Sequence, residues 1–118
     1  MQLAATSNSN PTLTAVAIYL DDVNRTSHQA LRLTEPSQVQ AFAVTAIEQA
    51  TEATGLLSWA SRESEGREGF TYLNGMIENG VVLPLTAARN AAAAGDVKAA
   101  LDGFVAAINR IDEINDRL

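Results

Sequence analysis

The 118-residue chain has no cysteine, a single histidine and very few aromatic residues, which make up 5% of it. The lack of cysteine excludes disulfides, thiolate nucleophiles, iron–sulfur clusters and cysteine-ligated zinc. One histidine, His28, cannot build a three-histidine zinc site or a di-iron site with two Glu-x-x-His pairs. Glycine-rich phosphate loops and the G-x-S-x-G nucleophile elbow are also missing from the sequence. We therefore expect no metal, no cofactor and no catalytic residues, that is, a protein that is not an enzyme.

The chain has few charged residues and is acidic overall, with 14 acidic against 8 basic residues and a net charge of −6. The basic residues are scattered, whereas binding to a phosphate backbone requires them to be clustered, so we expect no nucleic-acid partner. No apolar run approaches the roughly 20 residues that cross a bilayer, so we also expect no membrane partner. Met1–Ala5 lacks the basic side chain of a signal peptide, and together with the absence of cysteine this predicts a cytoplasmic location.

The chain length fits one domain, which we place at residues 11–118, after a flexible N-terminal tail at residues 1–10. Asn10-Pro11 is a helix-start signal, because Asn caps free N–H groups and Pro tolerates the first helical position. Apolar residues then recur every third or fourth place, which predicts a first helix from Pro11 to about Leu33. These apolar positions are Leu13, Val16, Ala17, Leu20, Val23, Ala30 and Leu31.

A second helix is predicted from Ser37 to about Ser64, because Pro36 disfavours helical geometry in the residue before it. Its apolar pattern continues across Gly55 without a change of phase. A third helix follows the glycine-containing loop 65–69, and Asn79-Gly80 and Pro84 predict that it is kinked or split near Pro84. Its apolar positions are Phe70, Leu73, Ile77, Val81, Leu85, Ala88, Ala91 and Ala92.

Gly95-Asp96 is the sharpest joint, since Gly suits the residue after a helix and Asp suits the N-cap of the next one. So short a connection makes the third and last helices antiparallel neighbours. The last helix shows a heptad seam in which Asn115 is the polar exception. One hypothesis is that Asn115 sets the register of an oligomer, and the alternative is that it lies beyond the packed region, at the fraying end of the helix. The seam consists of Val97, Leu101, Phe104, Ile108, Ile111, Asn115 and Leu118.

These segments predict an all-α, antiparallel bundle of four long helices. Alanine recurs on the predicted inner faces and lets helix axes approach closely, but each alanine buries little apolar area. We expect a monomer of marginal stability, and hence a homo-oligomer, most simply a dimer, or a bound partner. The inner alanines are Ala43, Ala46, Ala50, Ala53, Ala60, Ala88, Ala92, Ala100 and Ala107.

Large side chains are concentrated where the second and third helices meet, at Trp59, Phe70, Tyr72 and Met76. Trp and Tyr are typical interface anchors, so these residues are a candidate partner-binding cluster. The alternative is that they close the end of the bundle as part of the core. The acidic net charge favours a partner with a basic surface, mainly through steering.

His28 suggests a second interpretation. The segment His28-Gln29-Ala30-Leu31-Arg32-Leu33 in a four-helix domain of this length resembles the histidine phosphotransfer domains of phosphorelays. That family carries its phosphoaccepting His on a helix, followed by Leu, Lys and Gly. Here Leu31 and Arg32 come one place late, and no Gly follows.

The primary hypothesis is a non-enzymatic module that acts through protein–protein interaction, as an adaptor, inhibitor or chaperone-like protein. The alternative is a phosphotransfer carrier that uses His28 as phosphoacceptor. A third possibility is a small apolar ligand held between the alanine-rich helices.

Overall fold

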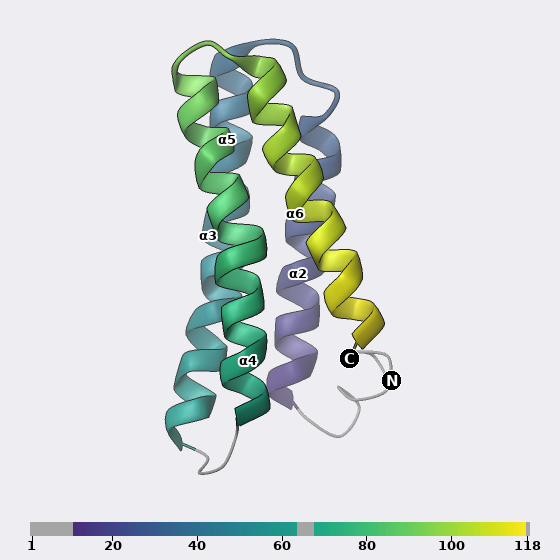
Figure 1. The fold of residues 1–118 in the computed structure, drawn as a ribbon, viewed down its shortest axis with the longest axis vertical. Helices are drawn as coiled ribbons and strands as arrows, with labels where there is room; N and C mark the ends of the chain where they lie inside the picture. The colour runs from purple at the N-terminus through teal and green to yellow at the C-terminus, as the bar shows by residue number, and fades with distance from the viewer. Residues whose placement is uncertain (1–10, 64–67, 118) are drawn as a thin grey trace.

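The computed structural model describes residues 11–63 and 68–117, so the predicted tail at 1–10 and loop residues 64–67 lie outside the described residues. The described chain forms α2 (Pro11–Ala30), α3 (Pro36–Glu63), α4 (Glu68–Ile77), η1 (Glu78–Val82), α5 (Leu83–Ala93) and α6 (Val97–Arg117). No strand occurs in these ranges. Because α4, η1 and α5 form one continuous rod, the molecule has four long helices that alternate in direction (Figure 1). The prediction of an all-α antiparallel bundle is confirmed.

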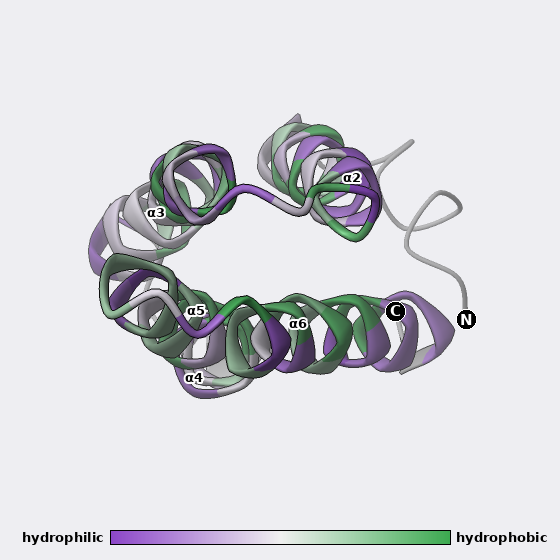
Figure 2. Ribbon diagram, turned by 90° about the horizontal axis from the view of Figure 1, so that it is seen from above, coloured by the Kyte–Doolittle hydropathy of each residue, from purple (hydrophilic) through white to green (hydrophobic). Residues whose placement is uncertain are grey.

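The bundle has two layers of two helices each (Figure 2). One layer contains α2 and α3, and the other contains the rod α4–η1–α5 together with α6. Between the layers, α3 packs on α4 and α5, whereas α2 packs on α6. The Cα atoms span 45 × 23 × 16 Å, so the molecule is long and narrow.

The core between the layers is built largely from alanine. On α3 a continuous line of buried residues is spaced alternately by four and three, and it crosses the exposed Gly55 without a break. The line consists of Val39, Ala43, Ala46, Ala50, Ala53, Leu57 and Ala60. All nine alanines predicted to face inward are buried. The predicted apolar phase of α3 is therefore confirmed along its whole length.

Helix ends follow the predicted signals with small shifts. The first helix ends at Ala30, three residues earlier than predicted, because N–H groups from Leu31 onward donate to carbonyls three residues back. The second helix begins at Pro36, where the Glu35 carbonyl accepts the first N–H bonds, so the start predicted at Ser37 was one residue late. The third helix begins at Glu68, inside the loop predicted at 65–69.

The Gly95-Asp96 joint is confirmed in detail. Gly95 has a φ of 84°, a left-handed conformation that costs glycine little. Its N–H donates to the Ala92 carbonyl at 2.9 Å, and the Asp96 N–H donates to the Ala91 carbonyl at 2.8 Å. The Asp96 carboxylate then accepts from the Ala99 N–H at 3.1 Å and caps α6.

The interruption predicted near Pro84 is a π-helical turn, η1, that joins α4 to α5. Pro84 has no N–H to donate to the carbonyl of Gly80, and its ring would clash with that carbonyl in a regular α-helix. The Leu83 N–H instead bonds to the carbonyl of Glu78, five residues back, which widens the turn. The apolar spacing of four over Leu73–Leu85 matches this wider turn, so the apolar face stays directed at the core.

The seam predicted for the last helix is wrong at its C-terminal end. The buried line on α6 runs through Ala100, Phe104, Ala107, Ile111 and Ile114, and Asn115 is exposed. The predicted seam continued the heptad spacing from Ile111 to Asn115, whereas the structure buries the apolar Ile114 and leaves its polar neighbour at the surface. A role for Asn115 in oligomer register requires a second copy to cover it, and stays a prediction.

Candidate functional site

A surface depression of about 340 Å³ opens beside α4, the π turn η1 and α6. Its lining includes Tyr72, Gly75 and Met76 of α4, Asn79 and Gly80 of η1, and Arg110 of α6. We call this depression the α4–α6 groove. Among the described residues that line it, only Arg110 is charged.

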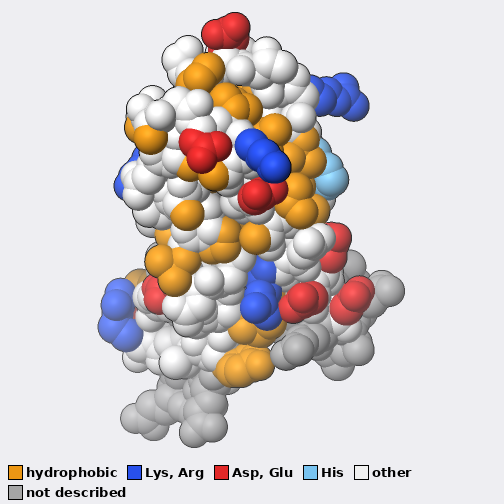
Figure 3. Space-filling view, turned by 45° about the horizontal axis from the view of Figure 1, so that its top comes forward, with side chains coloured by type: hydrophobic (Ala, Val, Ile, Leu, Met, Phe, Trp, Pro, Cys, Tyr) orange, Lys and Arg blue, Asp and Glu red, His pale blue; other side chains and the backbone are white. Residues whose placement is uncertain are grey.

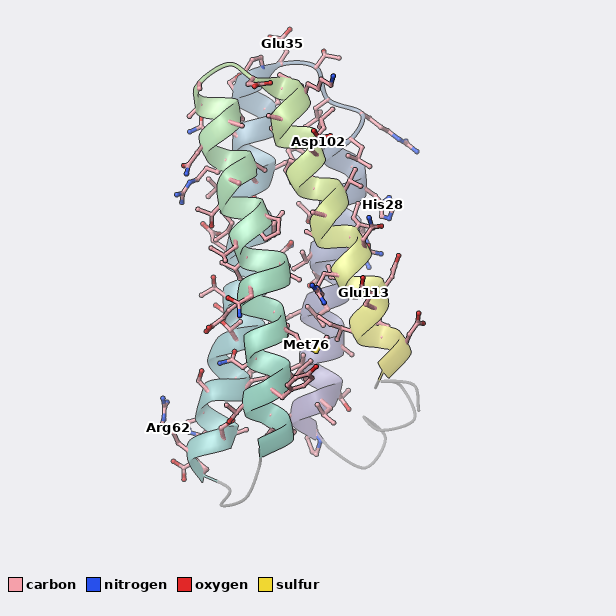
Figure 4. All side chains as sticks on the ribbon, in the orientation of Figure 1. His28, Glu35, Arg62, Met76, Asp102 and Glu113 are labelled. Carbon is pink, nitrogen blue, oxygen red and sulfur yellow. The ribbon has the colours of Figure 1, made fainter. Side chains whose placement is uncertain are left out.

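The groove arises because α6 diverges from α4. Near its N-terminus α6 contacts α5 closely, but it touches α4 only sparsely. Figure 1 shows the C-terminal half of α6 tilting away from α4 and toward α2. Figure 4 shows Met76 extending from α4 toward this half of α6, on which Glu113 lies. The groove therefore begins at the level of η1, where the two helices part.

Gly80 and Arg110 form the upper end of the groove. A Cβ atom at position 80 would overlap the Cγ and Nε atoms of Arg110, so the arginine stem occupies the space that any other side chain would take. Asn79 and Gly80 belong to the π turn, a geometry often found at functional sites. The missing side chain of Gly80 thus determines where Arg110 lies.

The guanidinium of Arg110 is held on one side only. Its Nη1 donates to Oε2 of Glu113 at 3.0 Å, and the two side chains are 39% and 54% exposed. Within the described ranges, Nη2 has no hydrogen-bond partner. Arg110 can therefore still donate from Nη2 to an incoming acceptor.

The predicted cluster of Trp59, Phe70, Tyr72 and Met76 is divided by the structure. Tyr72, 62% exposed, and the half-buried Met76 both line the groove. Phe70 is only 9% exposed and belongs to the core, as the alternative interpretation proposed for the whole cluster. Trp59 is 55% exposed but does not line the groove.

Helix geometry explains why Trp59 is separated from Tyr72. The Asn74 amide donates to the Ser58 hydroxyl at 3.1 Å, which fixes the sides on which α3 and α4 face each other. Trp59 follows Ser58 and Leu57 and therefore points away from the buried side of α3. On α4, Tyr72 is two residues from Asn74 and therefore points to the opposite side of the helix, away from α3. Sequence spacing brings the two aromatic residues close along the chain, and helical rotation places them on different surfaces.

Sequence reasoning missed Arg110, Asn79 and Gly80 as site residues. Asn79-Gly80 and Pro84 were recognised only as an interruption of the helix. Arg110 does not belong to the predicted seam of the last helix, and nothing in its neighbourhood along the chain points to Gly80. The contact between Arg110 and Gly80 arises from the packing of two helices that are distant in the sequence, so no local sequence pattern indicates it.

His28 lies exposed in the last turn of α2, with Leu31 and Leu33 half-buried after it. Figure 4 shows it directed outward, away from the groove. In the portion of the chain that the structure covers, no group of three or more His, Asp or Glu residues could hold a metal ion. Figure 3 shows acidic and basic side chains interspersed with apolar ones on the visible face, without a basic stripe.

Comparison with family models, with curated proteins and with solved structures finds no match for this chain. None of the helices within the described ranges is both long and apolar enough to span a membrane.

Proposed function

We propose that this protein acts by binding another protein through the α4–α6 groove, and not by catalysis. The observation that supports this most directly is the exposure of Tyr72 beside Met76 and Arg110. Tyr, Met and Arg are enriched in protein interfaces relative to the rest of a protein surface. Tyr and Arg are also overrepresented among the few residues that contribute most of the binding free energy.

The dimensions of the groove suit one anchoring side chain of a partner. Its volume of about 340 Å³ is near the lower end of the range for small-molecule sites. Enclosed sites bury most of a ligand, whereas this groove opens on the surface beside exposed helices. If one side chain of the partner enters the groove, the rest of the partner's interface would lie against the exposed surfaces of α4 and α6.

The net charge of −6 supports a partner whose overall surface is basic. Charges of one sign raise the rate of encounter with an oppositely charged surface, and salt weakens that effect. The association rate with the partner should therefore fall as ionic strength rises. A rate that is independent of salt would contradict this part of the proposal.

A photocrosslinking experiment in the native host tests the groove as the contact surface. The photoreactive amino acid p-benzoylphenylalanine replaces Tyr72 in one variant and Trp59 in the matched control, because both aromatic residues are more than half exposed. We expect an adduct of discrete mass from position 72 that disappears when Arg110→Gln is added, and none from position 59. Equal adducts from both positions, or none from position 72, would contradict the proposal.

Self-association is a further part of the proposal, and a dimer is its simplest form. The alanine-rich core supports it, since each buried alanine contributes less apolar area than a leucine would. Sedimentation velocity at micromolar concentration measures the mass directly. A compact monomer of 12.5 kDa at all concentrations would contradict self-association without affecting the groove.

Phosphotransfer through His28 is the second candidate function, and the exposure of this residue on a four-helix bundle favours it. Incubation with a phosphorylated response regulator would transfer label to the wild type and not to His28→Gln. The lack of a glycine after His28 puts this candidate behind partner binding. Transfer of label that depends on His28 would reverse that order.

A further inference from the structure

The charge and shape of the α4–α6 groove indicate the chemistry of what enters it. We infer that the partner inserts a segment in which an acidic side chain stands next to an apolar or aromatic one, and that Arg110 binds the carboxylate. This inference rests on the proposed function and specifies its partner. It commits to an acidic side chain within a chain, rather than to a free carboxyl terminus.

Arg110 is the reason to expect an anion. It is the one charged residue among the lining residues that the structure describes, and Glu113 bonds to its Nη1 atom. Nη2 remains able to donate, and a hydrogen bond between a guanidinium and a carboxylate is among the stronger ones in proteins. A cationic group placed here would instead meet the positive charge of Arg110 at contact distance.

The π turn holds Arg110 in position before anything binds. The arginine stem lies where the Cβ of residue 80 would be, and Glu113 orients the guanidinium from the far side. An arginine free in solvent loses much rotamer freedom when it binds, whereas one already confined loses less. Gly80 therefore acts as a positioning residue for Arg110.

The remaining lining of the groove suits an apolar neighbour of the carboxylate. Met76 offers a polarisable thioether that packs favourably against aromatic rings, and Tyr72 provides a flat apolar surface with a polar tip. Asn79 contributes a carboxamide that can donate to the backbone of an inserted segment. An acidic residue followed by an aromatic one can satisfy both parts of the lining.

The acidic contact is compatible with a partner whose overall surface is basic, because the two effects act over different distances. Steering depends on net charge over a Debye length of about 8 Å or more at physiological salt. Binding in the groove depends on Arg110 within hydrogen-bond distance. One carboxylate among basic surroundings on the partner meets both conditions.

Titrations of the whole protein followed by NMR test the inference with peptide probes of defined charge. The probe is N-acetyl-aspartyl-phenylalaninamide, and its neutral and cationic counterparts carry asparagine or lysine in place of aspartate. N-acetyl-phenylalanine, with a terminal carboxylate, is the fourth probe. We expect saturable shifts of Tyr72, Met76 and Gly80 signals with the aspartyl probe, at a Kd of about 1 mM, and binding of the asparaginyl probe on the order of tenfold weaker.

Two variants and a matched control assign this preference to Arg110. Arg110→Gln should bind the aspartyl and asparaginyl probes equally, and Gly80→Ala should reduce the preference by displacing the arginine stem. Arg62→Gln removes the same charge from an exposed position at the end of α3 and should leave the preference intact. Circular dichroism of each variant checks that the helices are retained.

Several results would overturn the inference. These are tighter binding of the lysyl probe, a preference for aspartate that survives Arg110→Gln, tighter binding of N-acetyl-phenylalanine than of the aspartyl probe, or no saturable shift up to about 10 mM of any probe. The crosslinking experiment distinguishes this failure from failure of the proposed function. An adduct from position 72 without the acidic preference would keep partner binding and reject the acidic segment.

Discussion

The two halves of α6 meet the third helix in contrasting ways. In the N-terminal half, Gly103 lies so close to α5 that an added Cβ would be 2.5 Å from the Pro84 carbonyl oxygen and 2.9 Å from the Ala88 Cβ. In the C-terminal half, α6 is held away from α4, and the space at Gly80 is taken by the stem of Arg110. One glycine admits a neighbouring backbone, and the other admits a long charged side chain.

This difference separates the rigid part of the molecule from the adaptable part. A backbone carbonyl cannot move without moving its helix, so Gly103 fixes the distance between α5 and α6. An arginine side chain has several rotatable bonds and can move at small cost. The closely packed half therefore maintains the fold, and the diverging half leaves a surface that can bind a partner.

The largest loss of stability is expected when a large side chain is removed from the closely packed half. Phe104 is fully buried in the core, and Phe104→Ala should lower the free energy of unfolding by about 3–5 kcal/mol. Tyr72→Ala, in the groove, is the matched aromatic control and should lower it by no more than about 1 kcal/mol, because this side chain is 62% exposed. Urea denaturation measures both values. Similar losses for the two variants would show that Tyr72 belongs to the core and would abolish the distinction between the halves.

Gly103→Ala should have the second-largest effect. The new methyl group meets the Pro84 carbonyl and the Ala88 side chain, so α5 and α6 must separate or shift. Overpacking of this kind costs about 1–3 kcal/mol, which exceeds the helix propensity that alanine gains. A lower urea midpoint at unchanged slope is the expected result. An unchanged or raised midpoint would mean that the two helices are not in close contact here.

Much of this packed half follows from the sequence. The helical spacing of apolar residues predicts which side of α3 is buried. The chemistry of Gly95-Asp96 predicts the joint between α5 and α6. These features depend on local spacing and on conformational preferences of single residues. The interruption at Pro84 is predicted for the same reason, although its form as a π turn is not.

The groove is less predictable because it depends on how helices are rotated and tilted. Closeness along the chain places Phe70 and Tyr72 in the same predicted cluster, yet helical rotation buries the first and exposes the second. On α6, the buried line passes through Ile114 and leaves Asn115 exposed, one place away from the position that the heptad spacing predicts. Arg110 meets Gly80 only after both helices are placed, so no spacing along the chain indicates their contact.

Gly55→Ala provides the reference for helix propensity alone. Gly55 lies in the interior of α3, and nothing stands within 4 Å of an added Cβ. Replacing glycine by alanine in such a position should raise the free energy of unfolding by about 0.5–1 kcal/mol, since the unfolded chain loses conformational freedom. A raised urea midpoint checks the value. A loss of stability would indicate that α3 is not a regular helix at Gly55.

Gly80→Ala should show the smallest change in stability, and its comparison with Gly103→Ala is the sharpest test of the two halves. Replacing Gly80 by alanine stabilises the helix by about as much as at position 55, through helix propensity. The new methyl group, however, displaces the Arg110 stem and disturbs the exposed ion pair of Arg110 with Glu113. Exposed pairs of this kind are worth about 0–1 kcal/mol, so the two changes nearly cancel.

The Gly80→Ala variant should therefore unfold at nearly the wild-type urea concentration while the Nε signal of Arg110 shifts in the NMR spectrum. A loss as large as that of Gly103→Ala would mean that the π turn at Gly80 is packed as rigidly as the α5–α6 contact. The C-terminal half of α6 would then be part of the structural core. Near-neutral stability with a displaced arginine would instead establish that the space at Gly80 positions a side chain for binding and contributes little to holding the fold together.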